Sequence, residues 1–285
     1  MNVRNFLVYG IGKLIPDSLW LQMKYKQHLG KRGDFMNPQT FNEKMQWLKL
    51  NDRNPEYSLM ADKYSVKKRV SELIGEQYVI PLLGVWNRAE EVDISGLPDQ
   101  FVLKTTHDCG GVIVCRDKSR FDYNKMVNSF SARLSKNYYW NCREWPYKNI
   151  QPRIIAEEYM EDKKSKVLPV YKILCFNGQP EIIQTIQNDK QPNESIDYFD
   201  VNWNLLDLRQ NYPNSEIPLS RPEKLTEMLE IARKLSRGTR FIRIDLYSIN
   251  GDIYFSEYTF YSDAGFAAFV PERWDKKLGD MIQLN

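Results

Sequence analysis

The sequence predicts an α+β fold that combines antiparallel β-hairpins with amphipathic helices. The first observation is a pair of segments, 241–247 and 253–260, which are rich in β-branched and aromatic residues and flank the turn-forming pair Asn250-Gly251. The second is the stretch 101–115, where a glycine-containing loop joins two short strand-like segments. The third is Thr40-Phe41-Asn42-Glu43, a capping box that predicts the start of a helix.

Composition sets limits on the class of protein. The chain has 285 residues, of which 42% are hydrophobic and 27% are charged, as in ordinary soluble proteins. A net charge of +3 gives no reason to expect a nucleic-acid partner. Four cysteines without a CxxC pair, and no recognisable secretion signal, lead us to expect reduced thiols and a cytoplasmic protein. Two histidines and scattered cysteines disfavour a zinc site.

Residues 1–59 are expected to form a basic helical N-terminal region. The first 33 residues hold six Lys or Arg and one acid, and apolar side chains recur at Leu19, Trp20, Met23 and Tyr25. One interpretation is an amphipathic arm that makes peripheral contact with an anionic inner membrane. The favoured alternative is a helix packed on the rest of the protein with its lysines in water.

Further local signals predict the next elements. Asp62 is expected to cap a helix, with Lys63 in the first turn, and residues 79–86 form an apolar run typical of a buried strand. Asn177-Gly178 predicts a hairpin turn between strands 171–176 and 180–187. Ser220 and Glu223 resemble a second capping box ahead of a helix.

The hairpin at 241–260 carries two carboxylates, Asp245 and Glu257. If both point to one face they can ligate a hard cation, whereas a carboxylate inside a sheet is otherwise costly. A two-residue turn at Asn250-Gly251 would place them on opposite faces, so an odd loop over 250–252 or a β-bulge is required. Arg243 and Thr259 would then share that face. The alternatives are carboxylates that face water or pair with Arg243.

The stretch 101–115 suggests a phosphate site. Lys104 lies on the first predicted strand, 101–105, and the loop from His107 contains Gly110 and Gly111. Glycines allow backbone N–H groups to approach an anion, and a lysine supplies a point charge. His107 either touches the terminal phosphate or is an exposed, idle loop residue.

Together these stretches resemble the ATP-grasp superfamily. The matching pieces, in chain order, are Asp62-Lys63-Tyr64, the lysine strand with its glycine loop, the segment 154–160 (IIAEEYM) and two acids twelve positions apart. Details such as FNEKMQWLKL, REWPYKNI, YKILCFNG and EYTF resemble more narrowly the teichuronopeptide-biosynthesis (TupA-like) branch found among bacterial polysaccharide genes. The resemblance extends from about Pro16 to the C-terminus.

The resemblance implies two α+β lobes that clasp ATP, at 60–152 and 153–285, after the helical arm. It implies ATP contacts from Lys63, Lys104, His107, Gly110, Gly111, Lys172 and the backbone of Glu157-Glu158-Tyr159-Met160. One or two Mg²⁺ ions would bind Asp245, Glu257 and Thr259, while Arg243, Lys104 and His107 would serve the chemistry. Lys172 either reaches phosphate or pairs with an acid. Thr259 stands where relatives usually have asparagine, which puts the second metal site in question.

The function implied is an ATP-dependent carboxylate–amine ligase that acts through an acyl phosphate. Its partners would be a carboxylate-bearing glycan or glycan precursor, such as a uronic acid, and an amine such as an amino acid. A glycosyltransferase is the main alternative, although no two aspartates are two positions apart as a DxD motif requires. A phosphotransferase and a non-catalytic nucleotide- or membrane-binding scaffold are the others.

Overall fold

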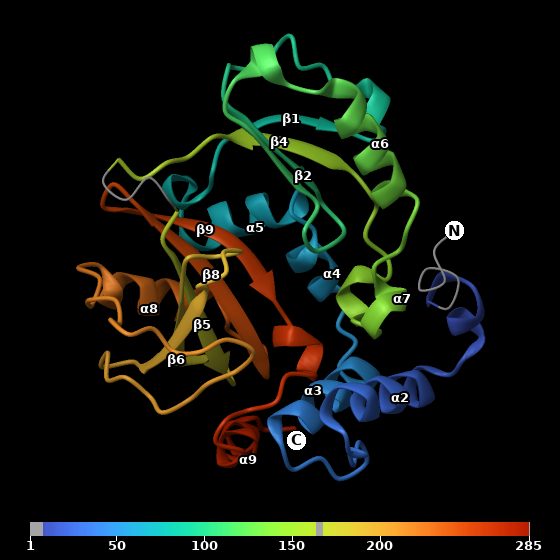
Figure 1. Ribbon diagram of the computed structural model, residues 1–285, viewed down its shortest axis with the longest axis vertical. Helices are drawn as coiled ribbons and strands as arrows, with labels where there is room; N and C mark the ends of the chain where they lie inside the picture. Colours follow the sequence, from blue (N-terminus) through green and yellow to red (C-terminus); the bar gives the residue numbers. More distant parts are fainter. Residues whose placement is uncertain (1–7, 164–167, 285) are drawn as a thin grey trace. The chain divides into compact units, whose positions relative to one another are not determined.

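Two antiparallel β-sheets organise the chain, each in its own compact unit (Figure 1). The computed structural model describes residues 8–163 and 168–284. The first unit combines the described residues up to Ile15 with Arg53–Glu161, and the second combines Pro16–Asp52 with the chain from Asp162 onward. The N-terminal region expected over 1–59 is therefore divided between the two units.

The first unit is built on a four-stranded sheet with the strand order β1-β4-β2-β3. Its strands are β1 (Leu82–Trp86), β2 (Phe101–Thr105), β3 (Val112–Cys115) and β4 (Ile154–Glu158). Its helices are α4 (Glu56–Ala61), α5 (Ser65–Ile74), α6 (Tyr123–Leu134) and α7 (Tyr139–Cys142). Short 3-10 turns lie at Ile11–Leu14, Glu76–Tyr78, Ala89–Glu91, Lys118–Arg120 and Trp145–Tyr147. Helix α6 packs on β2, and its Met126 and Phe130 are buried beside Phe101 and Leu103.

The second unit is built on a five-stranded sheet with the strand order β7-β6-β5-β8-β9. Its strands are β5 (Val170–Phe176), β6 (Gln179–Gln187), β7 (Ser195–Asp200), β8 (Phe241–Ile249) and β9 (Asp252–Thr259). Its helices are α2 (Asp17–Leu29), α3 (Phe41–Asn51), α8 (Leu225–Leu235) and α9 (Arg273–Met281), with a 3-10 turn, η6, at Ser262–Gly265. Helix α8 packs on β5, β6 and β8, and α3 packs on α9 and η6.

Several local predictions are confirmed because they rest on turn and cap chemistry. The predicted limits of β2 and β3 match the structure. Both residues of the Asn250-Gly251 turn have positive φ, at 54° and 88°. The Thr40 side chain accepts from the backbone N–H of Glu43, and the Glu43 side chain accepts from that of Thr40, which completes the capping box.

Other local predictions are wrong. Helix α8 begins at Leu225 and Ser220 lies outside it, so the second capping box does not form. Helix α5 begins at Ser65, which leaves Lys63 before the helix rather than in its first turn. Strand β1 lies at a sheet edge, where Leu82, Leu83 and Val85 are each more than a third exposed, so residues 79–86 are not a buried strand.

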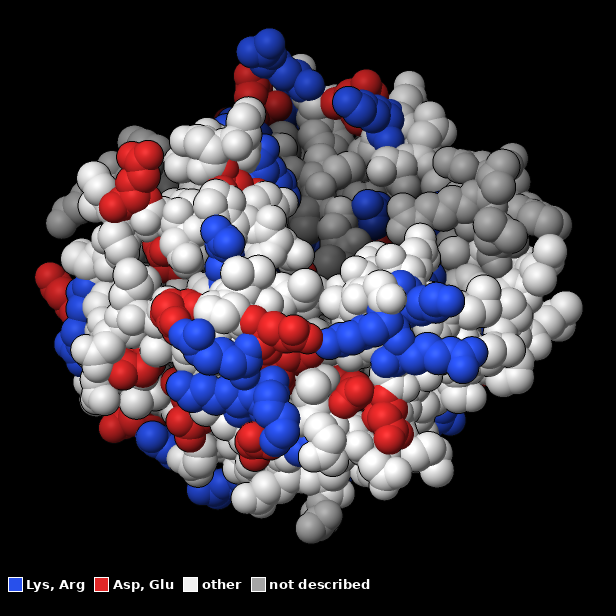
Figure 2. Space-filling view, turned by 60° about the horizontal axis from the view of Figure 1, so that its bottom comes forward, with Lys and Arg blue, Asp and Glu red and all other residues white. Residues whose placement is uncertain are grey.

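Helix α2 packs on the second unit through Trp20, Leu21 and Tyr25, whereas Leu19 and Met23 are exposed. The helical spacing therefore identified only part of the buried face. Basic and acidic side chains are interspersed over the face seen in Figure 2. Just after α2, Lys31 pairs with Glu272 at 2.7 Å. Among the residues that the structure describes, no helix is long and apolar enough to cross a membrane.

Candidate functional site

The acidic hairpin places Asp245 directly opposite Glu257. The turn is the simple two-residue one, which pairs Ile249 with Asp252. A β-bulge at Ser256 then shifts the register, because Leu246 pairs with Phe255 while Asp245 pairs with Glu257. Residues directly opposite each other in an antiparallel pair share a face. Of the two routes to this parity expected from the sequence, the structure uses the bulge.

The carboxylate pair belongs to a row of polar side chains that crosses the whole sheet. Successive strand pairings place Tyr198 opposite Gln184, Gln184 opposite Lys172, Lys172 opposite Asp245, and Asp245 opposite Glu257. Cys175, at odd spacing from Lys172, lies against the Ala232 carbonyl of α8. The polar row therefore occupies the face of the sheet away from α8, where the core does not require apolar side chains.

Arg243 binds Asp245 in a bidentate ion pair. Its Nε and Nη2 donate to the two carboxylate oxygens of Asp245 at 2.7 Å, and the same guanidinium contacts Ser262 and Thr259 at 3.2 and 3.1 Å. Burial lowers the pKa of Arg243, but the Asp245 carboxylate outweighs burial and the pKa is raised. The salt bridge considered as an alternative for Arg243 thus forms. The Thr259 hydroxyl accepts from Arg243 in this arrangement.

Lys172 sits in the middle of the row beside these charges. Burial lowers its pKa, and so does the neighbouring Arg243, while Asp245 and Glu257 oppose that shift. The two readings of Lys172 were a phosphate contact and a pairing with an acid. Its position opposite Asp245 brings it to the acids, with its charge partly desolvated.

In the first unit, Glu157 forms the centre of a buried charge cluster. Its carboxylate accepts ion pairs from Lys67 at 2.6 Å and from Lys104 at 2.5 Å, and all three side chains are at least 85% buried. Burial by itself raises the pKa of Glu157, but Lys104 and Lys67 together lower it by more. The pKa of Glu157 therefore lies below its usual value. Burial lowers the pKa of Lys67. The cluster carries one positive charge in excess, which suits a phosphate.

Lys67 is a site residue that sequence reasoning missed. It lies four residues after Lys63 in α5, near the buried residues Val66 and Val70. Helical spacing alone did not distinguish it from a lysine that faces solvent. Lys67 also lines a cavity of about 960 Å³ together with Ile80, Pro81 and Leu82. A charged lysine with a carboxylate partner at a cavity wall is a stronger candidate than Lys63, whose ammonium group donates to a loop carbonyl.

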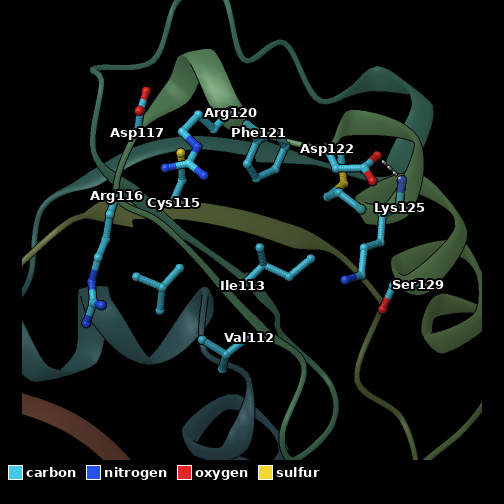
Figure 3. A pocket seen from close by; sticks show the side chains of 12 residues that line it. Val112, Ile113, Cys115, Arg116, Asp117, Arg120, Phe121, Asp122, Lys125 and Ser129 are labelled. Atoms are coloured by element: carbon cyan, nitrogen blue, oxygen red, sulfur yellow. Dashed lines mark hydrogen bonds between the residues drawn. The ribbon is translucent and has the colours of Figure 1, made fainter.

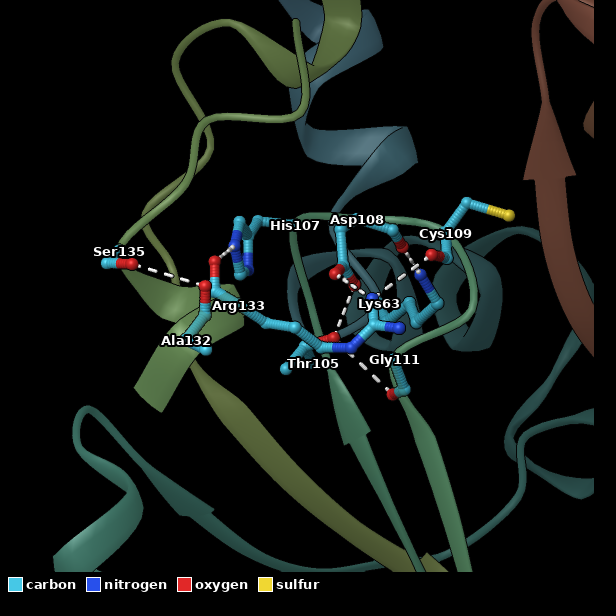
Figure 4. Close-up of polar contacts among 9 residues, drawn as sticks. All are labelled: Lys63, Thr105, His107, Asp108, Cys109, Gly111, Ala132, Arg133 and Ser135. Atoms are coloured by element: carbon cyan, nitrogen blue, oxygen red, sulfur yellow. Dashed lines mark hydrogen bonds and ion pairs between the residues drawn. The ribbon is translucent and has the colours of Figure 1, made fainter. Parts of the chain in front are cut away.

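Lys63 acts on the glycine loop from outside it. Its ammonium group donates to the Asp108 carbonyl at 2.5 Å (Figure 4). Its backbone N–H donates to the Thr106 carbonyl at 3.2 Å. Asp108 is held further by Arg133 at 2.6 Å and by the Thr105 hydroxyl. The loop is therefore braced on three sides in this structure.

The glycines of the loop have distinct reasons to be glycine. Gly110 has φ +79°, a conformation that other residues rarely adopt. A side chain at Gly111 would collide with Thr105 Oγ1, which lies 1.6 Å from the position of a Cβ atom. The backbone here passes closer to its neighbours than a side chain would allow, which fits the expected phosphate-cradling loop.

His107 is buried rather than exposed at the loop tip, with a residual exposure of 2%. Its Nε2 contacts the Arg133 carbonyl at 3.2 Å, and burial lowers its pKa (Figure 4). The expectation that His107 is exposed is therefore wrong, whereas its contact with the terminal phosphate stays a prediction. Its Nδ1 is buried as well and is not open to solvent in this structure.

The first half of the segment 157–160 lies in the sheet and the second half lies beyond it. Glu157 pairs with Leu82 and Val102 in the sheet, and the Glu158 N–H donates to the Pro81 carbonyl at 3.1 Å. Strand β4 ends at Glu158, so Tyr159 and Met160 follow the sheet rather than belong to it. Within the described chain, no backbone hydrogen bond engages the Met160 N–H. The backbone that could read adenine therefore begins after Glu158, not at Glu157.

Next to Lys104, the sheet presents apolar side chains. Val112 pairs with Lys104, and Val114 lies two positions along β3 on the same face. Both are about half exposed, at 46% and 51%. Val112 and Val114 also line a cavity of about 500 Å³ at β3 and α6, and Figure 3 shows Ile113, Arg120 and Lys125 around it. None of the predicted phosphate ligands lines that cavity.

A magnesium site is consistent with the second unit. Asp245 and Glu257 supply hard oxygen donors on one face, and Mg²⁺ typically uses one or two carboxylates plus substrate phosphates. Among the residues described, no group of three or more His, Cys, Asp or Glu side chains could hold a metal ion by itself. Such a site would therefore depend on oxygens from the nucleotide.

Comparison with known proteins identifies the relatives of this chain. The family described as TupA-like ATPgrasp matches residues 43–283. Among solved structures, D-alanine–D-alanine ligase from Bacillus anthracis with ATP is 14% identical, with a TM-score of 0.40 over 70% of this chain and 55% of that one. The ATP-grasp ligase PsnB with minimal precursor, Mg and ADP is 13% identical, with a TM-score of 0.40 over 77% and 57%.

A RimK domain ATP-grasp protein from Sphaerobacter thermophilus is 14% identical, with a TM-score of 0.42 over 79% of this chain and 69% of that one. The chain spans 55% to 66% of the length of the D-alanine–D-alanine ligases that it matches. No curated protein matches the sequence.

Proposed function

The chain belongs to the TupA-like ATP-grasp family, and from this premise we propose that it is an ATP- and Mg²⁺-dependent carboxylate–amine ligase. We propose further that the carboxylate belongs to a uronic-acid-containing cell-surface polysaccharide or its precursor, and that an amino acid supplies the amine. The observation that supports this best is the bulge at Ser256, which brings Asp245 and Glu257 to one face despite an even turn.

The two charge clusters divide the work on ATP. Lys67 and Lys104 neutralise phosphate oxygens, because their cluster with Glu157 has a cation in excess. Val112 and Val114 offer the apolar surface that a nucleobase requires. The backbone at Tyr159 and Met160 supplies the hydrogen-bonding edge. The loop 107–111 covers the terminal phosphate when it closes.

Asp245 and Glu257 would hold Mg²⁺, which supplies charge neutralisation at the β- and γ-phosphates. The Arg243 guanidinium, which here holds Asp245 through two hydrogen bonds, has the fork geometry that would hold a substrate carboxylate or its acyl phosphate in the same bidentate way. Lys172 opposite Asp245 stabilises negative charge on the same row. These residues orient the reactants and exclude water rather than react covalently.

Product analysis tests the proposal. The purified protein is incubated with ATP, Mg²⁺, glucuronic or galacturonic acid oligosaccharides, and glycine, L-alanine, L-glutamate or L-lysine. A ligase releases ADP and inorganic phosphate only when both a carboxylate and an amine are present. Glu257→Gln is the matched control, because it removes a metal ligand and keeps the size of the side chain.

A phosphotransferase would release ADP without inorganic phosphate, and a glycosyltransferase would release no ADP from ATP. Either pattern with wild-type protein contradicts the ligase proposal. Turnover by Glu257→Gln at the wild-type rate would remove Glu257 from the metal site.

A further inference from the structure

The turn η6, directly after the acidic hairpin, is held in a strained conformation. Its residues Asp263, Ala264 and Gly265 have φ of 48°, 52° and 65° in succession. A non-glycine residue with positive φ is uncommon, and each one carries an energetic cost that the surroundings must offset. Two such residues in a row indicate that the fold imposes this turn.

Side chains of helix α3 hold the turn η6 in this conformation. Gln46 Nε2 donates to the carbonyls of Ala264 and Gly265 at 3.1 and 2.9 Å, and Lys49 Nζ donates to the Ala264 carbonyl at 2.7 Å. Gln46 and Lys49 are at most 1% exposed, and Lys49 also lies 4.5 Å from the ring centre of Phe266. Buried polar groups that all serve one turn fix its geometry tightly.

This turn presents the carboxylate of Asp263 near the polar row. Ser262, its neighbour, contacts Arg243 at 3.2 Å. On its other side Asp263 accepts from Asn211, and the neighbouring Gln210 accepts from the hydroxyl of Tyr198 at 3.2 Å, so Asp263 lies beside two members of the polar row. The charge of Asp263 is therefore felt where the reactants would meet.

One oxygen of Asp263 is engaged and the other is available. Oδ1 accepts from the Asn211 side chain at 3.1 Å, and within the described part of the chain Oδ2 accepts no hydrogen bond. Asp263 is exposed, unlike Asp245, which is 2% exposed. It does not join Asp245 and Glu257 in a metal-holding group of acids among the described residues. A carboxylate held rigidly, open to solvent and outside the metal pair suits a cationic ligand.

We propose that Asp263 binds the amine substrate as its ammonium ion and thereby selects an amine that is protonated in solution. The bound ammonium then releases one proton to the surrounding water, and the neutral amine attacks the acyl phosphate and expels inorganic phosphate. The role is one of recognition and rests on the proposed ligase function. The charges support the assignment, because Asp245 and Glu257 are offset by Arg243 and Lys172, which leaves Asp263 as the uncompensated acid next to the row. Asn211, on the segment 207–213, holds Oδ1 and leaves Oδ2 to the substrate.

The test compares two nucleophiles on one enzyme. Hydroxylamine is largely uncharged near neutral pH and traps an acyl phosphate as a hydroxamate, whereas the four amino acids named above are protonated at nitrogen. Asp263→Asn removes the charge, keeps an oxygen that can accept from Asn211, and suits positive φ better than most residues. We expect the KM for the amino acid to rise about 10- to 100-fold, the loss typical of a charge-assisted hydrogen bond, with little change in kcat.

Hydroxamate formation by Asp263→Asn should stay at the wild-type rate. Asp189→Asn is the matched control, because it removes an exposed carboxylate of the same unit that lies outside the polar row, and its KM for the amino acid should stay near wild type. Asp263→Glu keeps the charge and should retain part of the selectivity if the asparagine variant folds poorly.

Equal losses with both nucleophiles, or no change with either, would overturn the assignment of Asp263. Wild-type protein that forms neither hydroxamate nor amide would instead refute the ligase function, so the two failures are distinguishable.

Discussion

Both units contain a cluster of charged side chains on a sheet, but the net charges of the two clusters have opposite sign. In the first unit, Lys67 and Lys104 share the single carboxylate of Glu157, which leaves one positive charge in excess. In the second, Arg243 and Lys172 balance Asp245 and Glu257 along the sheet, and the exposed Asp263 of the adjacent turn η6 leaves one negative charge in excess. The first arrangement suits phosphate and the second suits a metal ion or another cation.

The two clusters also differ in how they are held. Glu157 lies on β4, between β1 and β2, so its partners arrive from a neighbouring strand and from α5. Asp245 takes its arginine from its own strand, two residues away, and gains Glu257 through a bulge. The first cluster depends on long-range packing, whereas the carboxylate pair of the second cluster and its arginine are specified within one hairpin. Substitutions should therefore affect the two clusters differently.

The largest effect is expected from Asp245→Ala. It leaves the buried Arg243 guanidinium without its bidentate partner, and breaking a buried pair in this way costs about 3–5 kcal/mol of folding free energy. Glu257→Gln should cost far less stability, because Glu257 is only partly buried. Urea denaturation of both variants measures the difference. Equal losses of unfolding free energy in the two variants would mean that the greater burial of Asp245 does not make its carboxylate more important for stability.

The next effect concerns the acid limit of stability, compared between wild type and Glu157→Gln. The folded-state pKa of Glu157 is lowered from 4.5, so its ion pairs contribute fully above that value and are lost as pH falls through the lowered pKa. The difference in unfolding free energy between the two proteins should be constant near neutral pH and shrink below pH 4.5. A difference that does not change with pH would show that the carboxylate is not ionised in the fold.

A smaller effect is expected on ATP binding. Lys104→Ala should weaken ATP binding by about 1.5–3 kcal/mol, the worth of a charge-assisted contact. Lys63→Ala should weaken it less, because Lys63 braces the loop through the Asp108 carbonyl. Lys67→Ala should resemble Lys104→Ala, since both lysines share Glu157. Isothermal titration calorimetry decides the order, and wild-type affinity in all three variants would remove the first cluster from the nucleotide site.

The smallest effect is expected from Thr259→Asn. An amide oxygen is a better ligand for a hard cation than a hydroxyl, so the Mg²⁺ concentration needed for half-maximal turnover should fall modestly. The contact from Arg243 to Thr259 is partly buried and replaceable by an amide oxygen, so folding should change little. A Mg²⁺ titration of turnover checks this. An unchanged requirement would place the metal away from residue 259.

The acidic hairpin shows how far local chemistry can be read. Asn250-Gly251 fixed the turn, and the apolar residues on one face of both strands required Asp245 and Glu257 to share the other. The pattern did not predict whether an odd loop or a bulge would bring the two acids to one face, because both satisfy the same alternation. The Thr40 capping box was readable for the same reason, since its contacts span only three residues.

The contacts of the lysines could not be predicted from local sequence patterns. Lys63 and Lys67 lie one helical turn apart in the sequence, and only the position of α5 against β4 places Lys67 on Glu157 and Lys63 on the loop. Asp263 gave no signal at all, because its conformation is imposed by Gln46 and Lys49, more than two hundred residues earlier. The sequence by itself determined the hairpins, the turns and the face of the acids, since these follow from alternation and turn chemistry over a few residues. The tertiary structure decided which buried charges meet, because strand order and helix packing bring together groups that no local pattern relates.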